Sequence, residues 1–301
     1  MADGGRPPPR LHAGRVRNLS PVPAFDSFVG IDWSGAKGVR HKGIAVAVAE
    51  AGDGAPRLVA PPSPAGWARG EVAGFLEALP GRVLAGFDFS FAPPFVARGA
   101  YLPGLETAED GPGFWAHVDA QSDDADYGAA GFMAGPARPH FWMGAADGRK
   151  ADFLHWRVCE LAFNAGGGGK ASTLFDCVGA AQVAKASLAG MRVLHRLRRA
   201  FAIWPFDPPG ERTVVEIYGR AMLRHAGGRG LKVRDMATLN SALEALGSRP
   251  IAGWGPFNDN QTDALVTAAA LRRLSGSPHW WAPSGLTPEV ARTEGWTFGI
   301  G

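Results

Sequence analysis

The sequence has little cysteine, and its two cysteines stand far apart. Cys159 and Cys177 form no CxxC pair and have no nearby histidine at the spacing of metal ligands. A disulfide framework is therefore not expected, and the scarcity of cysteine favours a cytoplasmic protein.

Long hydrophobic runs and a strong charge of one sign are also lacking. No apolar run is long enough to cross a bilayer, and the polar, proline-rich start has no apolar stretch typical of a signal peptide. We expect residues 1–24 to form a flexible basic tail. The formal net charge is only +3, which permits a polyanionic partner without requiring one.

What the chain does have is enough apolar sequence for a packed core, with 46% hydrophobic residues in 301. Short apolar runs predict strands, and apolar residues at helical spacing predict helices. Residues 92–209, rich in Gly, Pro and aromatic residues, resemble an insertion into one domain that spans residues 25–301. The order predicts an α/β fold with a mixed five-stranded sheet flanked by helices. The strands are expected at 28–33, 42–52, 56–62, 81–91 and 213–218, and the main helices at 63–79, 175–201, 219–228, 234–248 and 258–276.

Acidic residues occur in three of the predicted strands. Asp32 and Asp88 end apolar runs, and Glu216 lies within another. In the last predicted helix, Asp259 and Asp263 are one turn apart and share a face. If these strands are neighbours, their carboxylates converge, and converging carboxylates repel one another and have raised pKa values.

A divalent cation would remove that conflict. Oxygen ligands with room for water suit Mg²⁺ or Mn²⁺. Two such ions about 4 Å apart would activate a water molecule and stabilise the leaving oxygen in phosphodiester cleavage. Asp32, on the most central strand, is expected to bridge both ions, and Asp88 and Glu216 to take the flanking positions. Asp263 would complete one ion from the helix, while Asp259 either assists it or only caps the helix.

The segments that carry these acids resemble, in order, the motifs of a known family. They are "VGIDWSG", "GFDFSFAPP", "VVEIYGRA", "NDNQTDALVTAAALRR" and the terminal "EGWTFG". Together they resemble a domain-of-unknown-function family of predicted ribonuclease H-like nucleases, from about residue 28 to residue 301, with the weakest match in the insertion. "QTDALVTAAA" is also similar to the last-helix motif of Holliday-junction resolvases, in which an Asp before Ala-Leu is a metal ligand.

This resemblance implies a ribonuclease H-like fold, with an antiparallel three-strand meander followed by parallel strands. It also implies that Asp32, Asp88, Glu216 and Asp263 are catalytic metal ligands and that the substrate is a nucleic acid, either DNA or RNA. The sequence departs from the family at Gly219, where the family usually has Pro after "EIY".

Four residues are candidates for contacts with a substrate phosphate. Ser34 follows the first acid and is small, and Lys37 and Arg220 bring positive charge near the acids. Lys170 follows a glycine run, Asn164–Gly169, that does not fit the phosphate-loop pattern. The alternative is that Lys37, Arg220 or backbone amides pair with the acids in the absence of metal. Farther along the chain, Arg157 and Glu160 are expected to form a structural ion pair.

Three functions are compatible with these features. The first is a Mg²⁺- or Mn²⁺-dependent nuclease or phosphodiesterase, which is a hydrolase. The second is an actin-like phosphotransferase or ATPase, because "GIDWSGAKG" faintly resembles the first phosphate loop of those proteins. The third is a non-catalytic nucleic-acid-binding protein. The chain shows only one core where actin-like enzymes need two, which counts against the second function. All four acids are present, which argues against a degenerate, non-catalytic site.

Overall fold

The fold is built around one six-stranded mixed sheet. The structure is a computed structural model, and it describes residues 23–169, 171–178, 183–228, 233, 235–253 and 257–301. The predicted tail therefore lies outside the described residues, apart from residues 23 and 24. The strands follow the order β3-β2-β1-β4-β6-β5. Their bounds are β1 Ser27–Asp32, β2 Ala45–Glu50, β3 Arg57–Val59, β4 Val83–Phe87, β5 Ala202–Trp204 and β6 Arg212–Glu216.

The sheet has an antiparallel half and a parallel half. β1, β2 and β3 form an antiparallel meander, as predicted, whereas β4 and β6 run parallel to β1. The prediction of five strands is wrong, because β5 adds a sixth, parallel to β6. It lies within the segment predicted to be an insertion and covers only three residues, which is too short for a recognisable pattern of alternation.

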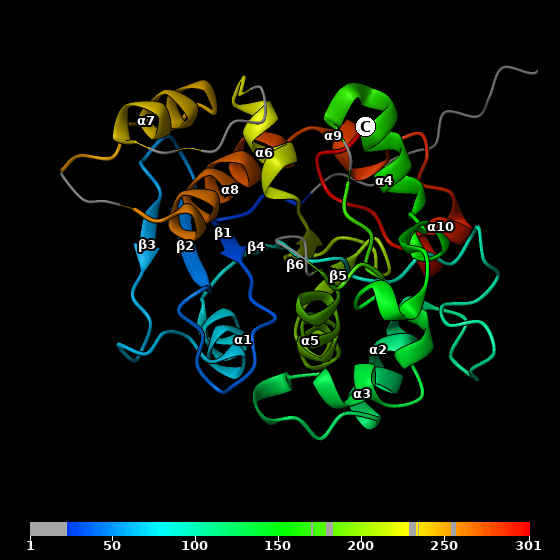
Figure 1. The fold of residues 1–301 in the computed structure, drawn as a ribbon. Helices are drawn as coiled ribbons and strands as arrows, with labels where there is room; N and C mark the ends of the chain where they lie inside the picture. Colours follow the sequence, from blue (N-terminus) through cyan, green and yellow to red (C-terminus); the bar gives the residue numbers. More distant parts are fainter. Residues whose placement is uncertain (1–22, 170, 179–182, 229–232, 234, 254–256) are drawn as a thin grey trace, which may run out of the picture.

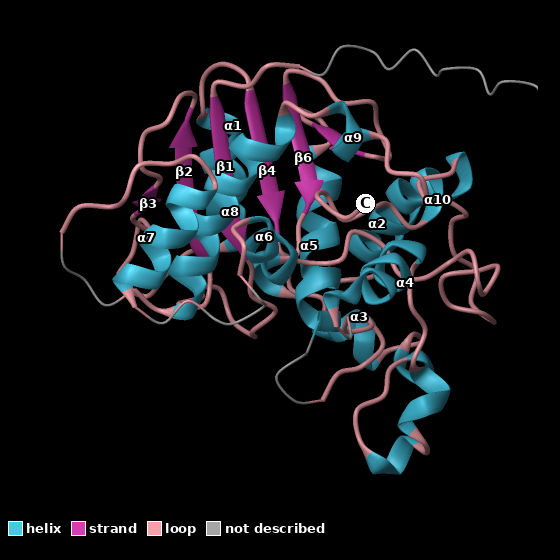
Figure 2. Ribbon diagram, turned by 90° about the horizontal axis from the view of Figure 1, so that it is seen from above, coloured by secondary structure: helices cyan, strands magenta, loops and turns pink. Residues whose placement is uncertain are grey.

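Helices cover both faces of this sheet (Figures 1 and 2). One face packs against α1, α2 and α5, and the other against α6, α7 and α8. α3, α4, α9 and α10 lie toward the side of β6 and β5 (Figure 2). The bounds are α1 Arg69–Ala78, α2 Gly111–Ala120, α3 Ala130–Ala134, α4 Val158–Phe163, α5 Val183–Leu197, α6 Gly219–His225, α7 Met236–Ala245, α8 Asp259–Ser275, α9 Pro278–Trp281 and α10 Pro288–Thr293.

Two of the predicted helices begin later than their apolar spacing indicates. α1 begins at Arg69 because a distant carboxylate caps it: Asp126 accepts hydrogen bonds from the backbone N–H groups of Arg69 and Gly70, at 2.8 and 3.0 Å. The segment before α5 is not helical at Phe175, which hydrogen-bonds instead to the backbone of Trp142. In both places tertiary contacts override the local pattern.

α8, the strongest helix prediction, is confirmed and lies closest to the sheet. Asn258 caps its first turn and accepts a hydrogen bond from the N–H of Gln261. Gly30 makes the close approach possible, because a Cβ there would lie 2.2 Å from the carbonyl oxygen of Ala264 and 2.9 Å from Cβ of Thr267. The packing of α8 against β1 therefore fixes where the first turns of α8 stand relative to the end of β1.

Successive side chains in each strand point to opposite faces of the sheet. In β1, Val29 and Ile31 belong to the core on the α1 and α5 side, whereas Phe28 belongs to the core on the α8 side. Asp32 has the same parity as Phe28 and Gly30, so it lies on the α8 side. This parity decides which of the predicted acids can meet.

Candidate metal and substrate site

A pocket of about 500 Å³ opens at the carboxyl ends of the parallel strands. Three of the predicted acids, Asp32, Asp88 and Glu216, line it. Apolar side chains make up much of the remaining wall. They are Trp33, Phe89, Phe163, Val183, Ile217 and Ile300.

Asp32 and Asp88 follow the same ladder of the sheet. Ile31 and Phe87 are register partners in β1 and β4, and the ladder continues because Asp88 N–H donates to the carbonyl of Ile31 at 3.1 Å. The two aspartates therefore occupy neighbouring positions at one edge, both on the α8 side. Both are partly buried.

Asp263 approaches the same place from α8. Its Oδ2 and the Oδ2 of Asp88 lie 3.7 and 3.4 Å from the point where a side-chain carbon on Gly219 would be. Gly219 thus leaves room between the two carboxylates, and its backbone N–H points at Asp88. A proline at this position, as the resembled family has, would lack that donor.

The pKa of Asp88 is raised by its burial and by the neighbouring carboxylates. Burial raises its pKa, the charge of Asp263 raises it further and the Gly219 amide opposes both, so that the pKa of Asp88 stands at about 7. Glu216 adds a smaller increase of the same sign. At neutral pH this carboxyl group is therefore poised between its protonated and ionised forms.

Glu216 lines the same pocket, but its side chain leaves the sheet on the other face from Asp32 and Asp88. Its register partner in β4 is Phe87 and not Asp88, so its side chain points to the opposite face of the sheet from the two aspartates. There it meets Arg157, whose two terminal nitrogens donate to the two carboxylate oxygens at 2.6 and 2.7 Å. Phe91 N–H and the Thr297 hydroxyl donate to the same oxygens at 2.7 and 2.6 Å.

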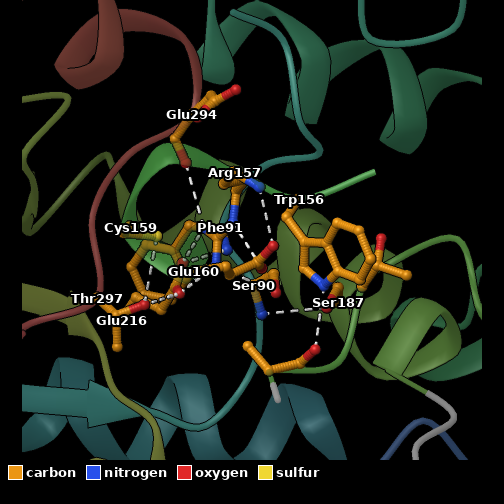
Figure 3. Close-up of polar contacts among 12 residues, drawn as sticks. Ser90, Phe91, Trp156, Arg157, Cys159, Glu160, Ser187, Glu216, Glu294 and Thr297 are labelled. Atoms are coloured by element: carbon orange, nitrogen blue, oxygen red, sulfur yellow. Dashed lines mark hydrogen bonds and ion pairs between the residues drawn. The ribbon is translucent and has the colours of Figure 1, made fainter. Parts of the chain in front are cut away.

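Figure 3 shows Arg157 and the polar side chains around it. The predicted ion pair with Glu160 is confirmed at 3.0 Å. Glu160 also lines the pocket, and burial raises its pKa despite the opposing charge of Arg157. Glu294 fixes the surrounding loops, since it accepts hydrogen bonds from the backbone N–H groups of Phe95, Val96 and Val158.

The sequence did not predict that Arg157 and Glu216 are partners. They lie 59 residues apart, and no local spacing connects them. Glu294 and Thr297, which contact Arg157 and Glu216, both lie in the terminal "EGWTFG" motif.

The other predicted residues are more scattered. Ser34 lines the pocket, whereas Lys37 is exposed beside a neighbouring hollow that Arg69 also lines. Arg220 is exposed, and Lys170 lies outside the described residues. Asp259 is exposed at the first position of α8. The helix cap is provided by Asn258 and not by Asp259.

No match was found when the chain was compared with protein-family models, with curated proteins and with solved structures. A function can therefore be inferred only from the chain's own residues. Two further observations bear on it. Over the described part of the chain, no group of three or more His, Cys, Asp or Glu side chains is already arranged to hold a metal ion. Among the described helices, none is long and apolar enough to cross a membrane.

Proposed function

We propose that this chain is a divalent-metal-dependent nuclease or phosphodiesterase with a ribonuclease H-like core. The observation that carries the proposal is the placement of Asp32 and Asp88 at the ends of adjacent parallel strands, on the face against which α8 brings Asp263. The antiparallel meander of β1–β3 beside the parallel β4 and β6 is the strand arrangement that the family resemblance implies. In this account β5 is an addition at the edge.

The residues fit a hard divalent cation in charge and ligand type. Asp32, Asp88 and Asp263 would hold Mg²⁺ or Mn²⁺ through carboxylate oxygens. The mutual repulsion that helps to raise the pKa of Asp88 would be relieved by a cation held by these carboxylates. Among the described residues no three such groups are already arranged to hold a metal ion, so binding would require the side chains of these aspartates to rearrange.

Once bound, the ion would polarise a phosphoryl oxygen and lower the pKa of a water molecule. The protein's own contribution is to orient its ligands and to limit the access of water. The buried strands fix the backbones of Asp32 and Asp88, while Trp33 and Phe89 form an apolar wall beside them. Ser34 lies on the pocket wall and Arg220 at the surface near Tyr218. Both remain candidates for contact with a substrate phosphate.

The size of the pocket bears on the substrate. A cavity of about 500 Å³ is in the range that takes one ligand of small-molecule size. One nucleotide unit would enter it, whereas an intact duplex would have to present a single strand or an end. We therefore expect single-stranded DNA or RNA, or a small phosphodiester, to be cleaved faster than duplex.

The test is cleavage of labelled single-stranded and duplex DNA and RNA with Mg²⁺, Mn²⁺ or chelator. Asp32→Asn removes one ligand charge and is expected to lower cleavage by at least about 100-fold. Asp53→Asn is the matched control, because Asp53 pairs with Arg249 at the surface, next to the opposite end of β1. It should leave cleavage unchanged.

Other results of this experiment would overturn the proposal or favour a different function. Cleavage that survives Asp32→Asn, or that needs no metal, would overturn the proposal. Hydrolysis of ATP without cleavage of nucleic acid would favour the phosphotransferase alternative. Salt-sensitive, metal-independent binding without turnover would favour a non-catalytic nucleic-acid-binding protein.

A further inference from the structure

The ion pair between Arg157 and Glu216 is closed to any further ligand. Both residues are buried, at 2% relative exposure each. A guanidinium group has five N–H donors, and here each has an acceptor: Glu216 takes two, and Glu160, Ser90 and the Glu294 carbonyl take one each. The four hydrogen bonds that Glu216 accepts occupy both of its oxygens.

Opening this pair for a metal ion would be costly. A cation on Glu216 would have to displace a buried guanidinium group in bidentate geometry and leave that positive charge without its main partner. The parity of β6 adds a second obstacle, since the Glu216 side chain starts from the other face of the sheet from Asp32 and Asp88.

The same pair controls the turn that follows Asp88. Arg157 donates to the Ser90 hydroxyl at 3.3 Å, and Glu216 accepts the Phe91 N–H at 2.7 Å. Two further bonds hold this turn from other elements: Ser90 N–H donates to Ser187 at 3.1 Å, and the Trp115 indole donates to the carbonyl of Phe91 at 2.6 Å. Residues two and three positions beyond Asp88 are thus tied to the ion pair (Figure 3).

We infer that Arg157 and Glu216 are positioning residues that fix Asp88, and that the site binds a single divalent ion through Asp32, Asp88 and Asp263. This inference depends on the proposed function for the presence of an ion. It replaces the two-ion arrangement predicted from the sequence, because the carboxylate assigned to a flanking position is committed to an arginine. Beside its small electrostatic effect on Asp88, Glu216 acts on the reaction through the backbone of the turn.

The first test uses the unmodified protein. Side-chain carboxyl signals are followed by ¹³C NMR during titration with Mg²⁺, and calorimetry with Mn²⁺ counts the ions. The expected result is one ion per chain, with the signals of Asp32, Asp88 and Asp263 shifting and the signal of Glu216 unmoved. A Glu216 signal that shifts with the aspartates, or a stoichiometry of two, would overturn the inference and leave the proposed function standing. If no carboxyl group responds to either ion, the proposed function fails, and the inference with it.

The second test separates positioning from general stability. Arg157→Lys keeps the charge but loses the two-pronged contact with Glu216. It is expected to weaken Mn²⁺ binding about tenfold and to shift the amide signals of Ser90 and Phe91, with the stoichiometry still at one.

Arg40→Lys is the matched control. It makes the same substitution in a two-pronged contact at the surface, between Arg40 and Glu71, so Mn²⁺ affinity should stay within about threefold of wild type. Equal Mn²⁺ affinities for the two variants would contradict the positioning role. If Arg157→Lys does not fold, the NMR titration of the wild-type protein still decides whether Glu216 is a ligand.

Discussion

The close contact between β1 and α8 provides a prediction about how the acids are held together. Replacing Gly30 by Ala adds a Cβ that would lie 2.2 Å from the Ala264 oxygen and 2.7 Å from the Ala268 nitrogen. Both atoms belong to the backbone of α8, so no side-chain rotation relieves the clash. The helix must retreat by about 1 Å to restore ordinary van der Waals contact, because protein interiors leave no spare room.

Overpacking of this kind costs about 1–3 kcal/mol of unfolding free energy, and a clash with the helix backbone favours the upper part of that range. The retreat also carries Asp263 away from Asp32. A misplacement of about 1 Å at a reacting centre can cost on the order of 100-fold in rate. We therefore expect Gly30→Ala to weaken Mn²⁺ binding at least tenfold in addition to its effect on stability.

Urea denaturation followed by circular dichroism gives the loss of stability, and calorimetry gives the Mn²⁺ affinity. Gly54→Ala is the control, because nothing lies within 4 Å of a Cβ at that exposed position. It should change the unfolding free energy by less than about 0.5 kcal/mol. If Gly30→Ala were as stable as Gly54→Ala and bound Mn²⁺ as wild type does, the placement of α8 against β1 would be refuted.

Three further predictions follow from the site. Arg157→Met leaves Glu216 and Glu160 buried without their counter-charge and should lower the unfolding free energy by about 3–5 kcal/mol in urea denaturation. Loss of the exposed Arg40–Glu71 pair should change the unfolding free energy little. A small effect of Arg157→Met would contradict the buried network. Because the pKa of Asp88 is raised to about 7, protons compete with the metal ion for this carboxylate, and Mn²⁺ affinity should fall about tenfold between pH 8 and pH 6. An Mn²⁺ affinity that does not change over this pH range would contradict the raised pKa. Because the pKa of Asp88 is raised, the folded, metal-free protein binds more protons at Asp88 than the unfolded chain does. The contribution of Asp88 to the unfolding free energy should therefore decrease as pH rises from about 4 to about 7. In urea titrations, Asp88→Asn should remove that part of the pH dependence.

Much of the sheet and of α8 could be predicted from the sequence because their signals are local. Alternation or a continuous apolar run marks the strands, and the Asn258 cap followed by an Ala/Leu-rich body marks the helix. The position of Asp32 and Asp88 at strand ends could be anticipated for the same reason. Once the two strands are parallel neighbours, their ends meet at one edge.

That the Glu216 side chain points to the other face of the sheet from Asp32 and Asp88 could not be predicted, because it depends on register. "VVEIYG" places an acid near the end of an apolar run just as "GFDFSF" does, yet the sheet aligns Glu216 with Phe87 and not with Asp88. A shift of one residue turns a side chain to the other face. Nothing in either segment alone fixes that alignment.

Polar contacts between residues far apart in the chain could not be predicted from the sequence either. Asp126, which caps α1, and Arg157, which pairs with Glu216, are distant in sequence from the residues they serve. Local spacing predicted only the short-range half of the Arg157 network, its pair with Glu160. The three-residue β5 was missed because tertiary pairing, and not sequence pattern, defines it.

The most direct test of the central claim is a calorimetric titration of Mn²⁺ into the wild-type protein and into Asp88→Asn at pH 8. We expect saturable binding of one ion by the wild type and at least tenfold weaker binding by the variant. Absence of saturable binding by the wild type, or equal affinity in both proteins, would contradict the claim that these aspartates form a cation site.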